Sequence, residues 1–554
     1  MSPGDKVRIR AGAAKQSRFC VDDILLTSTA AIVGDYISGY VKDTDGNPLA
    51  DVAVSDGFSV VKTNSNGYYT LKPNIDTYYI YYSIPADCAV PTNSYGQPAF
   101  FTAYKASQKR YDFTLTKLSG GVEKQFNLFC LADPQCKDST HRSYFKNETL
   151  PDIKNHVASK STPSYGVTLG DVVYSEGNRN CVSQMTYMRD HMNKSNTGGM
   201  PIFQTMGNHD YTFFSSSITI NPDDTSSTYN VKAQREFEKV FGPIDYSWNR
   251  GDVHFVCMRN MQWNANNNAA NYTMQFTDAQ YKWLKQDLSF VPTSKMVIIC
   301  VHIPFASYPN NTNVQNVINL LKNYKEAHIM SGHTHYNRNE PTKAGGKVYE
   351  HVHAAVCGTW WYSKINGDGC PNGYGVYEID GATIKNWYYK GANTGMNDVG
   401  YQMRLYPGNL RCGGRYDYIQ LQHGSNVLLA NVFNVDPNWT IEVYEDGVKK
   451  GTMTQISVKG DSPAYSTNES SPCKPSTASS QDWWAIGLHT GVVGRGNSSV
   501  GGNRSSYLTT CYHMYKYTIS NTSAKIKVVV KDRFGNEYST EEITKDYDYT
   551  NAKR

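Results

Sequence analysis

The sequence predicts a multidomain α+β protein, in which a central four-layered α/β/β/α domain lies between two β-sandwich domains. The chain has 554 residues, which is too long for a single core. Apolar strands alternate with helical segments between residues 120 and 392, and the flanking sequence shows only strand patterning. The predicted domains are residues 35–118, 119–395 and 396–554, and residues 1–34 are expected to be remnant strands of an upstream module or a linker.

The composition gives no support for nucleic-acid binding or for a transmembrane segment. The net charge is +5 and 19% of residues are charged, so bulk electrostatics give no case for nucleic-acid binding. The chain has no uninterrupted apolar run of about 18 residues, so no transmembrane segment is expected. The first residues lack the apolar core of a signal peptide, and we expect the natural protein to begin further upstream.

The segment 35–117 is expected to be a small β-sandwich. Short strand patterns recur there every 8 to 12 residues and are separated by turn dipeptides such as Asp45-Gly46 and Asn66-Gly67. The region from residue 399 onward has the same character, with alternating strands at 440–444 and 524–530. We therefore expect a second β-sandwich at the C-terminal end.

The central region shows two clear helices, at residues 276–288 and 313–324. Thr277 and Gln280 have the spacing of a capping box, which predicts the start of the first helix. Strand patterns at 348–356 and 375–389 are expected to complete a second sheet.

The 12 cysteines show no Cys-x-x-Cys pair. Cys130, Cys257 and Cys300 lie in apolar strands and are expected in the core. In an oxidising compartment, two sets of cysteines are candidates for disulfide bonds. These are Cys357 with Cys370, and a pair among Cys412, Cys473 and Cys511.

Five polar motifs follow apolar strands of the central region. They are Asp133-Pro134-Gln135, Gly170-Asp171, Gly207-Asn208-His209-Asp210, His302, and Gly332-His333-Thr334-His335. Open α/β sheets build their sites at the carboxyl ends of strands, so we expect these side chains to meet. Carboxylate, amide and imidazole ligands without thiolate suit manganese, iron or zinc.

In this order the motifs resemble those of the calcineurin-like metallophosphoesterase superfamily, over residues 126–337. The Asp-Pro-Gln first motif is similar to that of a subset that includes bacterial envelope proteins, which have an N-terminal carboxypeptidase-regulatory-like domain and a C-terminal β-sandwich. Gln135 stands where many members have His or a second Asp, which bears on the tuning of the first metal. The resemblance implies an exported protein, periplasmic or associated with the outer membrane of a Gram-negative bacterium.

The resemblance also implies two metal ions and a division of their ligands. Asp133, Gln135 and His335 would hold the first ion, Asn208, His302 and His333 the second, and Asp171 would bridge them. A metal-bridging hydroxide would be the nucleophile. His209, oriented by Asp210, would be the general acid. The motifs do not distinguish monoester, diester and pyrophosphate substrates, and they do not specify the oligomeric state.

Several residues near the motifs are candidates for substrate binding, although each also fits a structural role. They are Tyr211, Arg338, His353, Trp360 and Trp361. The alternative function is an exported surface binding protein with a vestigial or structural metal centre. The intact His209-Asp210 pair favours the enzyme, because a structural metal site does not need it.

Overall fold

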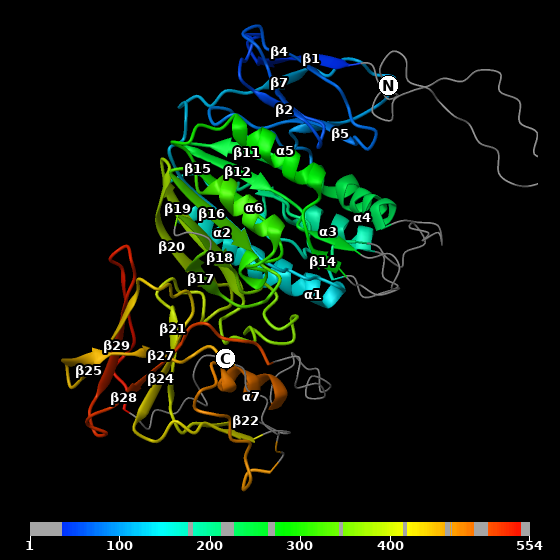
Figure 1. Ribbon diagram of the computed structural model, residues 1–554. Coiled ribbons are helices and arrows are strands. Elements are labelled where there is room, and N and C mark those ends of the chain that lie inside the picture. Colours follow the sequence, from blue (N-terminus) through cyan, green and yellow to red (C-terminus); the bar gives the residue numbers. More distant parts are fainter. Residues whose placement is uncertain are drawn as a thin grey trace, which may run out of the picture.

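The computed structural model describes residues 36–174, 181–211, 226–263, 272–342, 347–413, 418–459, 466, 468–491 and 508–544. An all-β N-terminal region, a central α/β region and a mainly β C-terminal region follow one another along the molecule (Figure 1). The strands expected within residues 1–34 lie outside the described residues.

The N-terminal region consists of two small sheets. One has the order β4 (Tyr68–Leu71), β1 (Ile37–Asp43) and β7 (Phe113–Leu115). The other has the order β3 (Val60–Lys62), β2 (Ala53–Ser55), β5 (Tyr79–Tyr82) and β6 (Phe101–Ala103). Gly46 and Gly67 have φ angles of 85° and 70°, so the two turn dipeptides need glycine as expected.

The first sheet of the central region has five strands. Its order is β10 (Ile202–Phe203), β9 (Ser164–Thr168), β8 (Gln125–Leu131), β19 (Gly373–Asp380) and β20 (Thr383–Gly391). β10, β9 and β8 run parallel, so their carboxyl ends meet at one edge. β19 pairs antiparallel with β8 and with β20.

The second sheet has six strands. Its order is β11 (Tyr246–Arg250), β12 (Val253–Cys257), β15 (Met296–Cys300), β16 (Glu326–Ser331), β18 (Val348–Val352) and β17 (Arg338–Pro341). The four inner strands are parallel, and β11 and β17 close the edges in the antiparallel sense. The expectation that residues 375–389 complete the same sheet as residues 348–356 was wrong, because β19 and β20 extend the five-stranded sheet.

The two sheets face each other through alternate side chains. Leu128 and Cys130 of β8 share one buried cluster with Ile298 of β15. The intervening residues, such as Phe129 and Val297, turn to the other faces and pack with helices. This alternation explains why the strands are apolar throughout, since both faces of each are covered.

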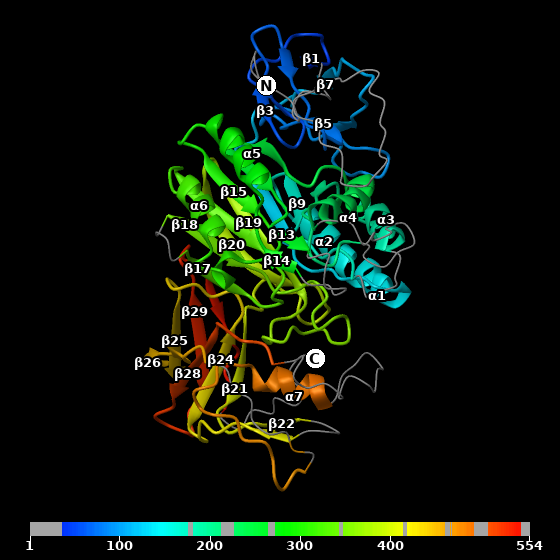
Figure 2. The ribbon, with the colours of Figure 1, turned by 45° about the vertical axis from the view of Figure 1, so that its right-hand side comes forward.

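Helices lie on both sides of the paired sheets (Figure 2). One side carries α1 (Ser139–Tyr144), η1 (Phe145–Thr149), α2 (Leu150–Ala158), α3 (Cys181–His191) and α4 (Ser226–Phe241), and the other α5 (Asp278–Ser289), η3 (Phe305–Ser307) and α6 (Thr312–Leu321). Between α4 and α5 in sequence lies the pair β13 (Met261–Trp263) and β14 (Tyr272–Met274). The predicted capping box is confirmed, because Thr277 and Gln280 exchange side-chain and backbone hydrogen bonds at the start of α5. The mixed α/β fold predicted for this region is confirmed.

Among its described residues, the C-terminal region contains three sheets. Their orders are β21 (Met403–Pro407), β24 (Val427–Val432), β28 (Met514–Thr518), β27 (Thr454–Gln455); β26 (Val448–Thr452), β25 (Thr440–Glu445), β29 (Ile526–Lys531), β30 (Glu537–Ser539); and β22 (Arg411–Gly413), β23 (Tyr418–Gln420). The region also contains a helix that strand patterning did not predict, α7 (Trp483–Gly491). Asp482 starts this helix, because its carboxylate accepts the backbone N–H of Ala485 at 2.9 Å.

The N-terminal region is fastened to the central sheets. The Trp283 indole of α5 donates to the Ser55 hydroxyl at 2.9 Å. The fully buried Arg250 of β11 donates to the carbonyl oxygens of Ala86 and Cys88 at 3.1 and 2.8 Å. The two regions therefore share buried polar contacts as well as apolar ones.

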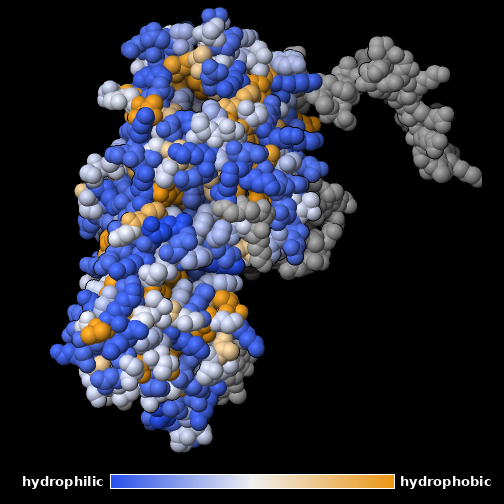
Figure 3. All heavy atoms as spheres, turned by 60° about the vertical axis from the view of Figure 1, so that its left-hand side comes forward, coloured by the Kyte–Doolittle hydropathy of each residue, from blue (hydrophilic) through white to orange (hydrophobic). Residues whose placement is uncertain are grey.

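Hydrophilic residues dominate the face shown in Figure 3, and hydrophobic ones occur there in small scattered groups. No helix within the described ranges is long and apolar enough to cross a membrane. Each cysteine that the structure describes is a free thiol, including Cys357, Cys370, Cys412, Cys473 and Cys511. The disulfides left open by the sequence are therefore not formed.

Candidate metal centre

The five motifs meet between the carboxyl ends of the two sheets. Asp133 follows β8, Asp171 follows β9 and Asn208 follows β10, all in the five-stranded sheet. His302 follows β15 and His333 follows β16, in the six-stranded sheet. Each sheet thus supplies part of the cluster, as the position of the motifs at strand ends predicts.

Most of the expected ligands have a left-handed backbone. The φ angles of Asp133, Gln135, Asp171, His333 and His335 lie between 42° and 69°. Residues other than glycine adopt this conformation rarely, at a cost of about 1–3 kcal/mol, and those that do gather at functional sites. Five such residues in one cluster indicate that the tight turns serve to aim their side chains.

Glycine at the motif positions allows the turns to approach one another. A Cβ atom on Gly207 would lie 2.2 Å from the Asp171 carboxylate, and one on Gly332 would lie 2.6 Å from the Asp133 carboxylate. Side chains at these positions would therefore push the ligands apart. Gly207 and Gly332 are therefore needed for space.

One half of the cluster gathers around His302. Its Nε2 lies 2.9 Å from Oδ1 of Asn208, 3.2 Å from Oδ2 of Asp171 and 3.2 Å from Nδ1 of His333. The ligand atoms of Asp171, His302 and His333 all lie within 4.8 Å of one another. This arrangement suits a single cation among them.

The other half of the cluster contains Asp133, Gln135 and His335. Nε2 of His335 lies 3.3 Å from Oδ1 of Asp133, and the Gln135 amide donates to Oδ2 of Asp171 at 3.1 Å. Oδ1 of Asp133 and Oε1 of Gln135 are buried and have no hydrogen-bond partner among the residues described. Orphaned buried oxygens are costly, so the donor set fits a metal ion.

The electrostatics of the cluster favour a positive charge beside the Asp171 carboxylate. Burial alone would raise the pKa of Asp171 and lower that of His302. Their mutual attraction prevails, so the pKa of Asp171 falls below its usual range and that of His302 rises to about 9. The nearby His333 stays neutral, because burial lowers its pKa to about 3.

His209 lies at the edge of the cluster. Its backbone N–H donates to Oδ1 of Asp171 at 2.7 Å, while its ring Nε2 is 4.0 Å from Oδ2 of the same residue. The ring stacks on Tyr174, with 4.3 Å between the centroids. Burial lowers the pKa of His209. The ring therefore stands beside the expected ligands without occupying a ligand position.

Asp210 does not orient the His209 ring, contrary to the expectation. Its two carboxylate oxygens accept the backbone N–H groups of Val173 and Gly207, at 3.0 and 2.8 Å. Nδ1 of His209 has no hydrogen-bond partner within the described part of the chain. Burial, followed by repulsion from Asp171, raises the pKa of Asp210 to about 7. Asp210 therefore braces the turn that carries Asn208.

A cavity of about 210 Å³ opens over the cluster. Gln135, Asp171, Asn208, His209, His333 and His335 form its floor, and Tyr174, Tyr272, Trp360 and Thr509 stand in its walls. The hydroxyl of Tyr272 lies 3.3 Å from Nε2 of His333. Thr509 comes from the C-terminal region, so two regions of the chain build the cavity.

Only one of the five expected substrate residues lines this cavity, namely Trp360. Trp361 is buried and donates to the Pro134 carbonyl at 2.7 Å, and His353 is held between Ser331 and Tyr377 in the sheets. Tyr211 packs in the core against Trp263, and Arg338 pairs with Glu340. These four side chains are structural, because nearness in sequence to a motif did not turn them toward the cavity.

Sequence reasoning missed three of the wall residues. Tyr174 lies three positions after Asp171, so its nearness to a motif was an available signal. Tyr272 and Thr509 lie far from every motif, and only the folded chain brings them to the site.

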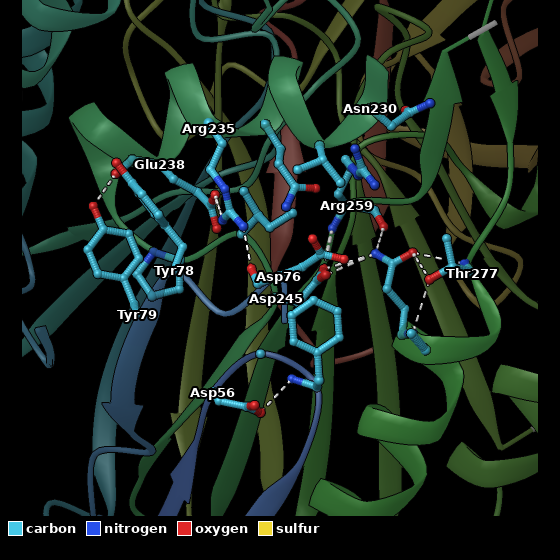
Figure 4. Close-up of a pocket in the computed structure, with 18 of the residues that line it drawn as sticks. Asp56, Asp76, Tyr78, Tyr79, Asn230, Arg235, Glu238, Asp245, Arg259 and Thr277 are labelled. Carbon is cyan, nitrogen blue, oxygen red and sulfur yellow. Dashed lines mark hydrogen bonds and ion pairs between the residues drawn. The ribbon is translucent and has the colours of Figure 1, made fainter. Parts of the chain in front are cut away.

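A second cavity, of about 260 Å³, lies where the N-terminal region meets α4 and α5 (Figure 4). Charged residues such as Arg235, Glu238, Asp245 and Arg259 line it. Burial raises the pKa of Glu238 to about 7 and that of Asp245 to about 6. It contains none of the motif residues, so we place the chemistry in the cavity over the cluster.

A mixed α/β domain with carboxylate, amide and imidazole groups gathered between two sheets defines a metal-dependent hydrolase. The family description "Calcineurin-like phosphoesterase" matches residues 127–337, and the descriptions of the N terminal and C terminal of calcineurin-like phosphoesterase match residues 35–118 and 350–490. The chain therefore belongs to the calcineurin-like phosphoesterases.

Solved structures give distant likenesses. The 5'-nucleotidase from Candida albicans SC5314 is 11% identical with a TM-score of 0.31, over 49% of this chain and 52% of that one. Purple acid phosphatase PPD1 from yellow lupin seeds is 13% identical with a TM-score of 0.35, over 63% and 68%. The 5'-nucleotidase precursor from Thermus thermophilus is 11% identical with a TM-score of 0.25, over 48% and 54%. The chain spans about half the length of both nucleotidases. None of the curated protein sequences matches this chain.

Proposed function

We propose that the protein is a dinuclear metal-dependent phosphomonoesterase. Asp133, Gln135 and His335 would hold one ion, and Asn208, His302 and His333 the other, with Asp171 between them. The ions are manganese, iron or zinc, because the donors are oxygen and imidazole nitrogen. When bound, the pair would supply Lewis acidity and an activated water.

The observation that carries this proposal is a pair of buried oxygens without hydrogen-bond partners among the described residues, which lie beside the group formed by Asn208, His302 and His333. Oδ1 of Asp133 and Oε1 of Gln135 lack hydrogen-bond partners in the described part of the chain. Nε2 of His302 lies 2.9 to 3.2 Å from three other possible metal-ligand atoms, which belong to Asn208, Asp171 and His333. Asp171 lies beside both groups, within 3.2 Å of His302 and of the Gln135 amide. Two ligand groups with a shared carboxylate support two ions.

His209 is proposed as the group that protonates the leaving oxygen. It lines the cavity, 4.0 Å from the Asp171 carboxylate, and Tyr174 fixes the plane of its ring by stacking. A general acid contributes a factor of about 10² to 10⁴ in rate. Burial lowers its pKa, so the ring gains its second proton at a lower pH than an ordinary histidine does. The intact ring favours an enzyme over a binding protein with a vestigial centre.

Cavity size supports a monoester with a small buried part. A volume of about 210 Å³ is below the roughly 300–1,000 Å³ of pockets that enclose a drug-sized ligand. The phosphoryl group would bind at the floor of the cavity, and the rest of the substrate would extend out of the cavity past Trp360 and Thr509. Aromatic side chains and several hydroxyl groups, among them that of Thr509, would contact the leaving group there.

We further propose the four-layered order α/β/β/α for residues 119–395, with separate β-sandwiches at 35–118 and 396–554. The paired sheets with helices on both outer sides support the first part. Two or more small sheets in each flanking region support the second. An exported location, periplasmic or at the outer membrane, is proposed from the first motif alone.

Metal analysis tests the function directly. After loading with manganese, iron or zinc, elemental analysis should find two fewer ions per chain in Asp171→Ala than in the wild type, because the carboxylate lies between both ions of the cluster. Asp45→Ala, in an exposed turn, is the matched control for removing one carboxylate. Full metal retention in Asp171→Ala would contradict the shared carboxylate. A metal-loaded wild type that does not hydrolyse an aryl phosphate would contradict the phosphomonoesterase itself.

A further inference from the structure

A second group of possible metal ligands lies outside the cluster described above. Asp368 and Cys370 come from the loop that leads to β19, and His513 comes just before β28 in the C-terminal region. Their ligand atoms all lie within 4.8 Å of one another, and all three side chains are at least 98% buried. Nε2 of His513 is 3.0 Å from Oδ2 of Asp368 and 3.8 Å from Sγ of Cys370.

Asn431 fixes the tautomer of His513. The Asn431 amide donates to the Asp368 carbonyl and to the Asp482 carboxylate, both at 2.7 Å. Its oxygen is therefore the atom that faces Nδ1 of His513 at 2.6 Å, and Nδ1 must carry a proton. A metal-binding histidine commonly donates its other N–H to an oxygen in this way.

The remaining nitrogen of His513 faces a carboxylate, so a positive species must lie between them. This species is either a proton or a metal ion. Oδ2 of Asp368 already accepts the backbone N–H of Asn337 at 2.8 Å, and Oδ1 accepts that of Cys370 at 3.0 Å. Backbone N–H groups thus hold both carboxylate oxygens in place, with Oδ2 aimed at His513.

The Cys370 sulfur is placed as an acceptor. The Asn337 side-chain oxygen accepts the backbone N–H of Ala354 at 2.8 Å, so its amide N–H groups face the sulfur at 3.3 Å. An N–H donor stabilises a thiolate. Burial raises the pKa of the Cys370 thiol.

We propose that Asp368, Cys370 and His513 bind a structural zinc ion that joins the C-terminal region to the central region. Thiolate, imidazole and carboxylate are the ligand types of zinc, and two anionic ligands balance its charge. Ligands at about 2.0 to 2.3 Å in a tetrahedron are separated by roughly 3.3 to 3.7 Å, close to the distances seen. The Cys370 thiol donates to the Phe433 carbonyl oxygen at 3.6 Å, and we assign this oxygen as the fourth ligand once the thiol has lost its proton.

Binding releases two protons, one from the Cys370 thiol and one shared between His513 and Asp368. The site is independent of the proposed catalytic centre, which has no sulfur ligand. It lies close to it in the chain, however, because Gly367 lines the catalytic cavity next to Asp368. The ion would therefore hold the wall that Gly367 and Thr509 form.

Cobalt(II) substitution tests the proposal on the full chain, because only a thiolate ligand gives a near-ultraviolet charge-transfer band. We expect the band in the wild type and in Asp171→Ala, in which the catalytic centre is impaired. Cys370→Ser and His513→Gln should lose it, together with one ion per chain. Cys511→Ser is the matched control, because its sulfur lies 3.4 Å from Nδ1 of His513, on the far side of the ring.

Two outcomes would overturn the proposal. One is a wild type that takes up cobalt without the band, which would leave His513 and Asp368 as a buried ion pair that shares a proton. The other is a band that persists in Cys370→Ser. Because the wild type alone decides the first outcome, a variant that fails to fold does not rescue the proposal.

Discussion

Nδ1 of His302 lies 2.7 Å from the carbonyl oxygen of Leu169, which ends the apolar run before Gly170. The hydrogen bond joins the six-stranded sheet to the five-stranded sheet and places the ring proton on Nδ1. The other ring nitrogen, Nε2, faces Asn208 and His333.

The close approach behind this hydrogen bond predicts the effect of Gly170→Ala. A Cβ atom at this position would lie 2.5 Å from Nδ1 of His302, and Gly170 has a φ of 86°. We expect the variant to lose metal and to lose at least about 1 kcal/mol of stability. Gly46→Ala is the control, because Gly46 has a φ of 85° with no atom within 4 Å of the added carbon. Both variants should melt lower, but only Gly170→Ala should lose metal on elemental analysis.

His209→Ala separates acid catalysis from metal binding. The variant should keep its metal, because the ring is not in a ligand position, and should lose about 10²-fold or more in kcat on an alkyl phosphate. An aryl phosphate, whose leaving group needs no proton, should be affected far less. Equal losses on the two substrates would rule out the acid role. Asp210→Asn should lower stability rather than reproduce this pattern, since Asp210 braces the backbone.

Thr509 tests whether the C-terminal region touches the substrate. Thr509→Val keeps the shape of the side chain and removes the hydroxyl from the cavity wall. One lost hydrogen bond corresponds to about 0.5–1.5 kcal/mol, so we expect KM to rise about 2- to 10-fold with little change in kcat. Thr452→Val, on an exposed strand, is the matched control. An unchanged KM on every phosphomonoester tried would place the substrate away from this wall.

Glu238→Gln should change how stability depends on pH. The pKa of Glu238 is raised to about 7 in the folded chain, from its ordinary value of 4.5, because the side chain is buried. The folded state therefore binds this proton more tightly, and stability falls as pH rises from about 4.5 through 7. The variant lacks this loss, so its advantage in unfolding free energy should grow by up to roughly 3 kcal/mol between pH 5 and 8. Denaturation at several pH values measures it, with the exposed Glu541→Gln as control. A constant difference would contradict the shift.

Thr277→Ala removes the cap of α5. The Thr277 hydroxyl accepts the backbone N–H of Gln280 at 3.1 Å, and loss of such a cap costs about 1 kcal/mol. Thermal unfolding should show a lower melting temperature than Thr293→Ala, which alters an exposed threonine just beyond the same helix.

The order of the motifs and their position at strand ends could be predicted from the sequence, because an apolar run followed by Gly or Asp reports a strand and its end. The α5 cap could be predicted for the same reason, since Thr277 and Gln280 signal it within four residues. The sheet to which each strand belongs could not be predicted from the sequence. Whether β19 joins β8 or β18 depends on pairing between distant segments, and both pairings give the same apolar pattern.

The direction of individual side chains was the second feature that could not be predicted from the sequence. Trp360 and Trp361 are neighbours with positive φ, yet one lines the cavity and the other donates to Pro134 in the core. Asp210 was expected to serve His209, but the tight turn offers its carboxylate two backbone N–H groups instead. Such choices depend on the turn geometry, which the residue types alone do not specify.

Arg250 shows that the boundary between the N-terminal and central regions is not a place where the chain can be cut freely. Its guanidinium is wholly buried in the six-stranded sheet, yet the carbonyl oxygens that satisfy it belong to Ala86 and Cys88. Removal of residues 36–118 would take away both carbonyl acceptors and leave the Glu123 carboxylate, 3.5 Å from the guanidinium, as its charged partner. We expect this loss of buried hydrogen bonds to a charged group to cost about 1–3 kcal/mol for each acceptor. Although separate family descriptions match the two regions, we expect them to melt as one cooperative unit.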